Sequence, residues 1–158
     1  MNTKFTKLSS QFGVIEYPVT LADMEEIMQE FPKSERKFYE FALTALKKVM
    51  KKDEKIYAFN MADPKLTKTG FIVVAEHNLI FVTLKGGLFG GADTEIVKYK
   101  DIKSVDFDII QGLLGISLMN TGIIYLEMKG MLGSKKRTIR NIPEENLDFI
   151  VQRLRDRV

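Results

Sequence analysis

The first third of the chain carries hydrophobic residues at helical spacing. Thr20, followed three residues later by Asp23, has the pattern of a capping box, which satisfies backbone amides at a helix N-terminus. We therefore expect a helix from Leu21 onward, ended or kinked by Pro32. The apolar positions of this helix are Leu21, Met24, Ile27, Met28 and Phe31.

A second amphipathic helix is predicted from about Ser34 to Lys52. Its opposite face is charged, and lysines gather near its end, where cations complement the helix dipole. A third helix is predicted after Pro143. The apolar stripe of the second helix is Phe38, Phe41, Ala42, Ala45, Leu46 and Val49, and that of the third is Leu147, Ile150, Val151 and Leu154.

Between these helices the hydrophobic pattern changes from a period of 3.6 to a period of 2 after Lys55. Short runs with tight turns between them indicate an antiparallel sheet that closes or forms a sandwich. No helix alternates with these strands, which excludes a parallel βαβ fold. We expect strands at about 55–61, 71–76, 79–85, 94–99, 102–109, 115–119, 123–128 and 136–141.

One predicted hairpin is apolar on both of its faces. Phe71, Val73 and Ala75 share one face of the first strand. Ile72 and Val74 lie on the other face of the same strand. Because a large exposed apolar patch is a liability in a soluble protein, we expect both faces to be covered. One face would line the core, and the other would receive the N-terminal helices or another subunit.

Composition narrows the chemistry. The chain has 158 residues, of which 45% are hydrophobic, and it has no cysteine and one histidine, His77. A disulfide framework, a cysteine-ligated metal and a thiol nucleophile are excluded. His77 lies at a predicted turn, and no acid–base or nucleophile–base pair can be assembled. We therefore expect no enzyme, no cofactor and no metal site. The net charge of +3 and the lack of a recognition motif also argue against nucleic acid.

Targeting signals are not evident in the sequence. Residues 1–10 are polar, and no apolar segment of a secretory signal follows them. The apolar runs are far shorter than the ~20 residues of a membrane-spanning helix. These features predict a cytoplasmic protein.

The order of segments in the second part resembles the bacterial pleckstrin-homology-like (PH-like) domains of the YvbH-like group. The resemblance covers about residues 54–157, and its most specific piece is Tyr99-Lys100-Asp101-Ile102-Lys103-Ser104-Val105 with the hydrophobic positions before it. The first hairpin loop, with only Lys65 and Lys68, departs from the Lys-x-Arg pattern of phosphoinositide binders. The matching segments are Leu79–Val82, the turn at Phe89-Gly90, Ile96–Val105, Gly115–Leu118, Ile124–Leu126, a basic last strand and a terminal helix.

The resemblance implies a mainly β fold with helices (α+β). It implies a bent antiparallel barrel of about seven strands, with a C-terminal helix covering one end and 94–99 and 102–109 as halves of one bent strand. Residues 1–53 would form an N-terminal two-helix extension, and residues 54–158 the barrel with its helix. The resemblance also implies a non-catalytic binding scaffold, for which oligomer assembly is a common expectation.

Basic residues are concentrated in the strand region. Residues 55–141 carry twelve basic and eight acidic side chains. If the basic groups converge, they form a patch for anionic lipid headgroups, each contributing about 1 kcal/mol near a membrane. Alternatively, they are solvated strand edges, where lysine discourages edge-to-edge pairing. The candidate anion- or lipid-binding residues are Lys98, Lys100, Lys135, Lys136, Arg137 and Arg140.

Apolar side chains also occur inside glycine-rich loops. Leu88 and Phe89 lie between two glycine pairs, and the segment 130–133 has the same character with Met131 and Leu132. Such loops either insert into a membrane interface or partner pocket, or fold back on the barrel.

Two functions follow from these features. The first is a non-catalytic module that self-associates as a homo-oligomer, or binds a protein partner, through apolar residues Leu88, Phe89, Ile72 and Val74. The alternative is peripheral membrane recruitment through the basic strand face. Only the second should weaken with salt, since screening acts on charge pairs and not on apolar contacts.

Overall fold

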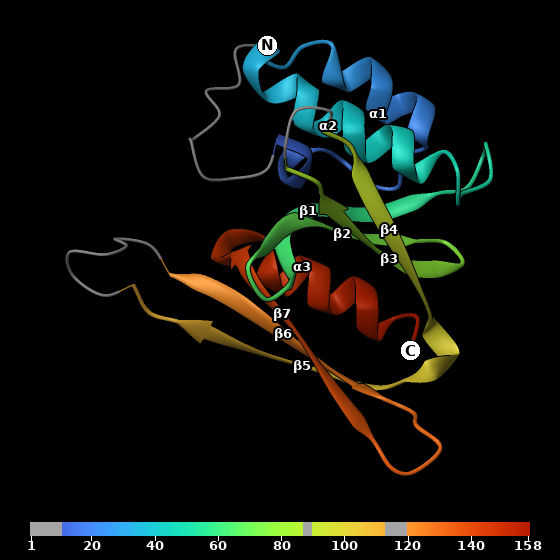
Figure 1. Ribbon diagram of the computed structural model, residues 1–158, viewed down its shortest axis with the longest axis vertical. Coiled ribbons are helices and arrows are strands. Elements are labelled where there is room, and N and C mark those ends of the chain that lie inside the picture. The colour runs from blue at the N-terminus through green and yellow to red at the C-terminus, as the bar shows by residue number, and fades with distance from the viewer. Residues whose placement is uncertain (1–10, 87–89, 113–119) are drawn as a thin grey trace.

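The computed structural model describes residues 11–86, 90–112 and 120–158. Among the described residues, helices come first and last, and strands lie between them (Figure 1). The elements are η1 (Gln11–Val14), α1 (Leu21–Met28), α2 (Lys33–Leu46), β1 (Ile56–Lys65), β2 (Lys68–Ala75), β3 (Asn78–Leu84), β4 (Ala92–Lys98), η2 (Tyr99–Asp101), β5 (Ile102–Ile110), β6 (Thr121–Met128), β7 (Lys135–Pro143) and α3 (Glu144–Arg155).

The start of α1 confirms the predicted capping box. The backbone amide of Asp23 donates to Thr20 Oγ1 at 3.3 Å, and the amide of Thr20 donates to Asp23 Oδ2 at 2.8 Å. The buried residues of α1 are Leu21, Met24 and Met28, which belong to the predicted stripe. Local sequence therefore determines both the start of this helix and the face that it buries.

The buried face of α2 differs from the prediction. Phe38 is 54% exposed, whereas Tyr39 and Leu43, which the predicted stripe omitted, are buried. The Tyr39 ring packs 5.0 Å from the Phe12 ring and 5.5 Å from the Phe71 ring, between centroids. Because of these aromatic contacts, the helix faces the sheet with Tyr39 and Leu43, about one position round from the predicted stripe. The helix also ends at Leu46, earlier than the predicted Lys52.

The strands form one antiparallel sheet with the order β4-β3-β2-β1-β7-β6-β5. β4 and β5 follow each other in sequence through η2, yet they lie at opposite edges of the sheet. The sheet is therefore bent but not closed, and the predicted bent strand 94–99/102–109 is two strands. The predicted strand 115–119 lies outside the described residues. The seven strands and the final helix agree with the architecture that the resemblance implies.

Two hydrophobic clusters divide the interior. The outer cluster joins η1, α1 and α2 to one face of β1–β3. The inner cluster joins the other face of these strands to β5–β7 and to α3, which lies between the two halves of the sheet (Figure 1). The molecule is thus built in layers. The N-terminal helices cover the β1–β4 half of the sheet, and α3 lies between this half and the β5–β7 half.

The doubly apolar hairpin is covered on both faces by this chain itself. Phe71 and Val73 of β2 belong to the outer cluster under the helices. Ile72 and Val74 belong to the inner cluster and are 0% exposed. Of the two coverings considered from the sequence, the N-terminal helices are the one present. Ile72 and Val74 were predicted as interaction residues, and this prediction is wrong because no partner can reach them in the folded chain.

Candidate functional site

A cavity of about 580 Å³ opens between the two halves of the sheet. It lies where the end of β1, the middle of β4 and the β6–β7 hairpin approach one another. The residues that line it are Pro64, Lys65, Glu95, Val97, Met128, Lys135, Lys136 and Arg137. Basic groups dominate this lining, with Glu95 as its acidic member.

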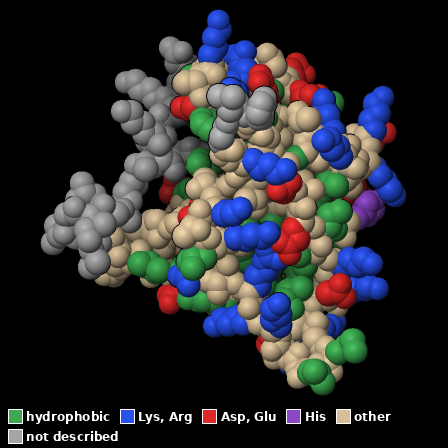
Figure 2. Space-filling view, viewed as in Figure 1, with side chains coloured by type: hydrophobic (Ala, Val, Ile, Leu, Met, Phe, Trp, Pro, Cys, Tyr) green, Lys and Arg blue, Asp and Glu red, His purple; other side chains and the backbone are tan. Residues whose placement is uncertain are grey.

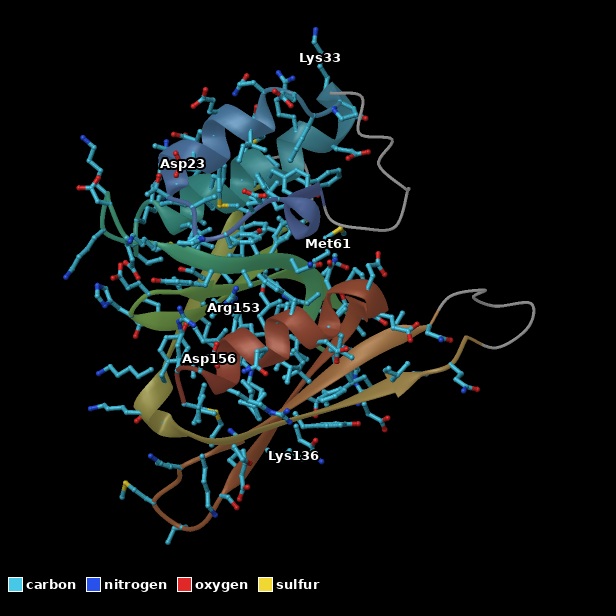
Figure 3. The ribbon with its side chains drawn as sticks, turned by 180° about the vertical axis from the view of Figure 1, so that it is seen from behind. Asp23, Lys33, Met61, Lys136, Arg153 and Asp156 are labelled. Atoms are coloured by element: carbon cyan, nitrogen blue, oxygen red, sulfur yellow. The ribbon has the colours of Figure 1, made fainter. Side chains whose placement is uncertain are left out.

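Three of the six predicted cations meet at this cavity. They are the first three residues of β7, next to the β6–β7 turn: Lys135, Lys136 and Arg137. The Lys136 ammonium lies 4.1 Å from the centroid of the Tyr125 ring, and Figure 3 labels this lysine on the β5–β7 half of the sheet. Lys136 therefore borders the cavity while its charged end covers the neighbouring strand β6.

The other three predicted cations do not line the cavity. Lys98 ends β4 and is exposed, and Lys100 lies in η2. Lys129 connects this region to the hairpin, because its Nζ donates to the Lys100 carbonyl oxygen at 2.7 Å. Arg140 is exposed and lies opposite Asp63 in the β1–β7 pairing. Lys135, Lys136 and Arg137 thus border the cavity, whereas Lys98, Lys100 and Arg140 lie outside its lining.

Arg137 has the most ordered environment of these cations. Its guanidinium forms two hydrogen bonds with the Glu95 carboxylate, one from Nη1 to Oε1 and one from Nη2 to Oε2 at 3.0 Å. The guanidinium carbon also lies 4.1 Å from the centroid of the Phe81 ring. Only 19% of the Arg137 side chain is exposed. A fork-shaped donor held in this way is suited to planar or tetrahedral oxyanions.

The electrostatics of Glu95 report the same convergence. The hydrogen bond from Arg137 is the largest influence and lowers the pKa of Glu95; burial opposes it, and the charges of Arg137, Lys65 and Lys135 add to the lowering. Nearby positive charge favours the carboxylate form. Arg137, Lys65 and Lys135 therefore act together on the Glu95 carboxylate as nearby positive charges.

The hairpin between β6 and β7 projects beyond the sheet. Met131 and Leu132 at its turn are fully exposed. Figure 2 shows hydrophobic side chains at the lowest point of the molecule, where Figure 1 places this turn, with basic side chains above them. Lys129 and Lys135 flank the turn in sequence and are exposed. Two hydrophobic side chains are thus exposed to solvent at a turn that exposed lysines flank on both sides.

Leu88 and Phe89, the other predicted apolar tip, lie outside the described residues. His77 is exposed at the β2–β3 turn, where its backbone amide donates to Glu54 Oε1 at 3.3 Å. In the described ranges, no group of three or more His, Cys, Asp or Glu side chains could hold a metal ion. No helix there is long and apolar enough to cross a membrane.

Sequence reasoning missed the groups that complete the site. Glu95 lies 42 positions from Arg137, and Phe81 lies on a strand that was predicted only as core. The sequence did carry one signal for Glu95. It lies two positions before Val97, so the two side chains share the same face of β4, and both line the cavity. Its partner could not be identified without the pairing of the strands.

An antiparallel seven-strand bent sheet with a C-terminal helix between its halves is the architecture of a PH-like fold. Residues 50–156 match the Bacterial PH domain family, and the chain belongs to this family. It is 60% identical over 157 residues to the SPbeta prophage-derived uncharacterized protein YokE of Bacillus subtilis (strain 168). This alignment covers 99% of the chain and 98% of that protein. No solved structure matches the chain.

Proposed function

We propose that this chain is a non-catalytic interaction module that associates with anionic membrane surfaces through its basic end, meaning Lys129 and the lysines and arginine that line the cavity, and through its β6–β7 turn. The observation that carries the proposal is the full exposure of Met131 and Leu132 beside Lys129 and Lys135. Self-association through the apolar hairpin has lost support because Ile72 is buried inside the chain. The other residues of that hypothesis, Leu88 and Phe89, lie outside the described residues and stay a prediction.

Physical chemistry favours this combination of groups. Each lysine near an anionic membrane contributes about 1 kcal/mol, and this attraction disappears beyond a Debye length. Full burial of a Met or Leu side chain contributes about 1.5–3 kcal/mol. Stable anchoring at an interface takes two such signals. A backbone turn cannot enter the hydrocarbon region with unpaired amides, so only its side chains would reach the acyl boundary.

The test is co-sedimentation with phosphatidylcholine vesicles, with and without phosphatidylglycerol, at low and high salt. We expect binding to the anionic vesicles only, with loss at high salt. Met131→Ser with Leu132→Ser should weaken binding by about tenfold or more, because two apolar side chains no longer reach the interface. Lys135→Glu with Lys136→Glu should abolish it.

Matched controls come from α2 and the turn that follows it, at the opposite end of the molecule, where Figure 3 labels Lys33. Phe38→Ser removes an exposed hydrophobic side chain, and Lys33→Glu with Lys48→Glu reverses two exposed charges. These variants should bind as the wild type does. Absence of binding to any vesicle, or equal losses in the α2 controls, would contradict the proposal.

A further inference from the structure

We infer that the cavity between β1, β4, β6 and β7 is a binding site for a phosphate group, and that Glu95 is an internal competitor for it. This inference deepens the proposed function by naming the chemical group that the basic end recognises. It rests on the proposed function only in so far as the phosphate belongs to a membrane lipid. The phosphate would displace the Glu95 carboxylate from the Arg137 guanidinium.

The size and lining of the cavity fit such a ligand. Its volume of about 580 Å³ lies within the range of small-molecule sites. Lys65, Lys135, Lys136 and Arg137 border it, against the carboxylate of Glu95. Pairing of Arg137 with Glu95 leaves Lys65 and Lys135 as surplus positive charge, while the Lys136 ammonium lies over the Tyr125 ring. A phosphate monoester, with close to two negative charges at neutral pH, would balance this surplus better than a carboxylate.

Arg137 supplies the recognition geometry. Its two Nη groups already bind two oxygens of one anionic group. The Phe81 ring beneath the guanidinium restricts its orientation, so little side-chain freedom remains to be lost when another oxyanion binds. The Glu95 carboxylate thus marks the place where two phosphate oxygens would lie.

Glu95 can leave this place because it is the more exposed member of the pair. Its side chain is 42% exposed, compared with 19% for Arg137. It comes from β4, an edge strand, whereas Arg137 comes from β7 in the middle of the sheet. Rotation of Glu95 toward water would open the Arg137 fork without disturbing the central strands.

The test is a titration with inorganic pyrophosphate, followed by NMR chemical shifts of residues that line the cavity. Glu95→Gln should raise the affinity about tenfold, because the competing charge is removed while a hydrogen-bonding side chain remains. Glu127→Gln is the matched control: this carboxylate binds Lys103 at 3.2 Å and Ser104 at 3.1 Å and does not line the cavity. It removes the same charge and should leave the affinity unchanged.

Arg137→Lys separates the fork from its charge. It keeps the positive charge, so a loss of pyrophosphate affinity would identify the bidentate contact as the source of binding. Thermal unfolding of each variant checks that the fold persists. An unchanged affinity in Glu95→Gln, an equal rise in Glu127→Gln, or shifts confined to residues away from the cavity would each overturn the inference.

Further arms separate this inference from the proposed function. Met131→Ser with Leu132→Ser should keep pyrophosphate binding while weakening vesicle binding. Tighter binding to phosphatidic acid vesicles than to phosphatidylglycerol vesicles of equal charge would identify a lipid headgroup as the source. Pyrophosphate binding without vesicle binding would support the cavity, with a soluble phosphate compound as its ligand, and would remove the membrane proposal.

Discussion

Tyr99 shows how one side chain ties distant parts of the chain together. Its hydroxyl lies 2.5 Å from the carbonyl oxygen of Ala75 and 3.0 Å from that of Asn78. The residue begins η2, so these contacts attach the connection between the two sheet halves to the β2–β3 turn. Burial raises the pKa of Tyr99, because a phenolate would lose its hydration inside the protein.

We predict that Tyr99→Phe lowers the free energy of unfolding by about 1–2 kcal/mol at pH 7, because a buried hydrogen bond is lost. In the wild type, stability is fully present below the unfolded tyrosine pKa of about 10 and decreases as the pH rises above it. The decrease should be shallower in the variant, since one raised pKa is removed. Urea unfolding between pH 7 and 11 measures both effects.

The control for this prediction is Tyr125→Phe, which alters a half-buried tyrosine on the outer face of β6. It should change stability at pH 7 much less than Tyr99→Phe does. Tyr17, whose pKa is also raised by burial, should keep part of the alkaline loss in both variants. Equal stability of Tyr99→Phe and the wild type at pH 7 would mean that the hydroxyl contacts add nothing.

Residue-level prediction from the sequence succeeded where the signal was local. The run of cations at Lys135–Arg137 was visible in the sequence, and it lines the cavity. Glu95 was missed because its ion pair depends on which strands face each other. Both faces of β2 were correctly seen as apolar and needing cover, but alternation alone cannot tell which face lines the inner core, or distinguish a covering helix from another subunit.

At the scale of elements, the contact of α3 with β6 depends on one glycine. A Cβ added to Gly122 would lie 2.7 and 2.8 Å from the two Leu147 methyl carbons. Leu147 is 1% exposed and belongs to the inner cluster. The helix can therefore approach the strand this closely only because position 122 has no side chain.

Gly122→Ala should destabilise the protein by about 1–3 kcal/mol, because a methyl group must displace Leu147 in a packed core. Gly86→Ala is the matched control, since a Cβ there meets nothing within 4 Å. Thermal unfolding of both variants measures the difference. If both lower the melting temperature equally, the close approach of α3 is not what position 122 provides.

The helices also show which element features local sequence determines. The capping box fixed the start of α1, and the apolar stripe of α3 was found with its residues Leu147, Ile150, Val151 and Leu154, all of which are buried. For α2, the predicted stripe included Phe38 and omitted Tyr39. Helical periodicity locates the buried face only to within one residue when neighbouring positions, such as Phe38 and Tyr39, are both aromatic.

At the scale of the whole molecule, the N-terminal helices are part of the fold and not an accessory. The family match begins at residue 50, after α2 has ended. Yet the outer cluster packs buried residues of η1, α1 and α2, such as Phe12, Met24 and Leu46, against β1–β3, and Figure 1 shows these helices over that half of the sheet. The predicted boundary at residue 53 lies between the segment that matches the family and the helices that cover one face of its sheet. We expect these two parts to unfold together.

The chain 50–158 alone should fail to fold as a stable monomer. Without the helices, one face of β1–β3 would expose large apolar side chains, each worth about 1.5–3 kcal/mol when buried. Such a loss is comparable with the whole stability of a domain, about 5–15 kcal/mol. We expect this fragment to aggregate or to lose cooperative unfolding. The face uncovered contains Phe59, Phe71, Val73, Ala75, Ile80 and Val82.

A point substitution tests the same dependence in the full chain. Leu43→Asp places a charge under α2, where Leu43 is 2% exposed, and should abolish cooperative thermal unfolding, because an unpaired buried charge cannot be accommodated. Thr44→Asp changes the exposed neighbour on the same helix and should leave the melting temperature nearly unchanged. A fragment 50–158 that unfolds cooperatively near the wild-type temperature would show instead that the β sheet and α3 are stable without their helical covering.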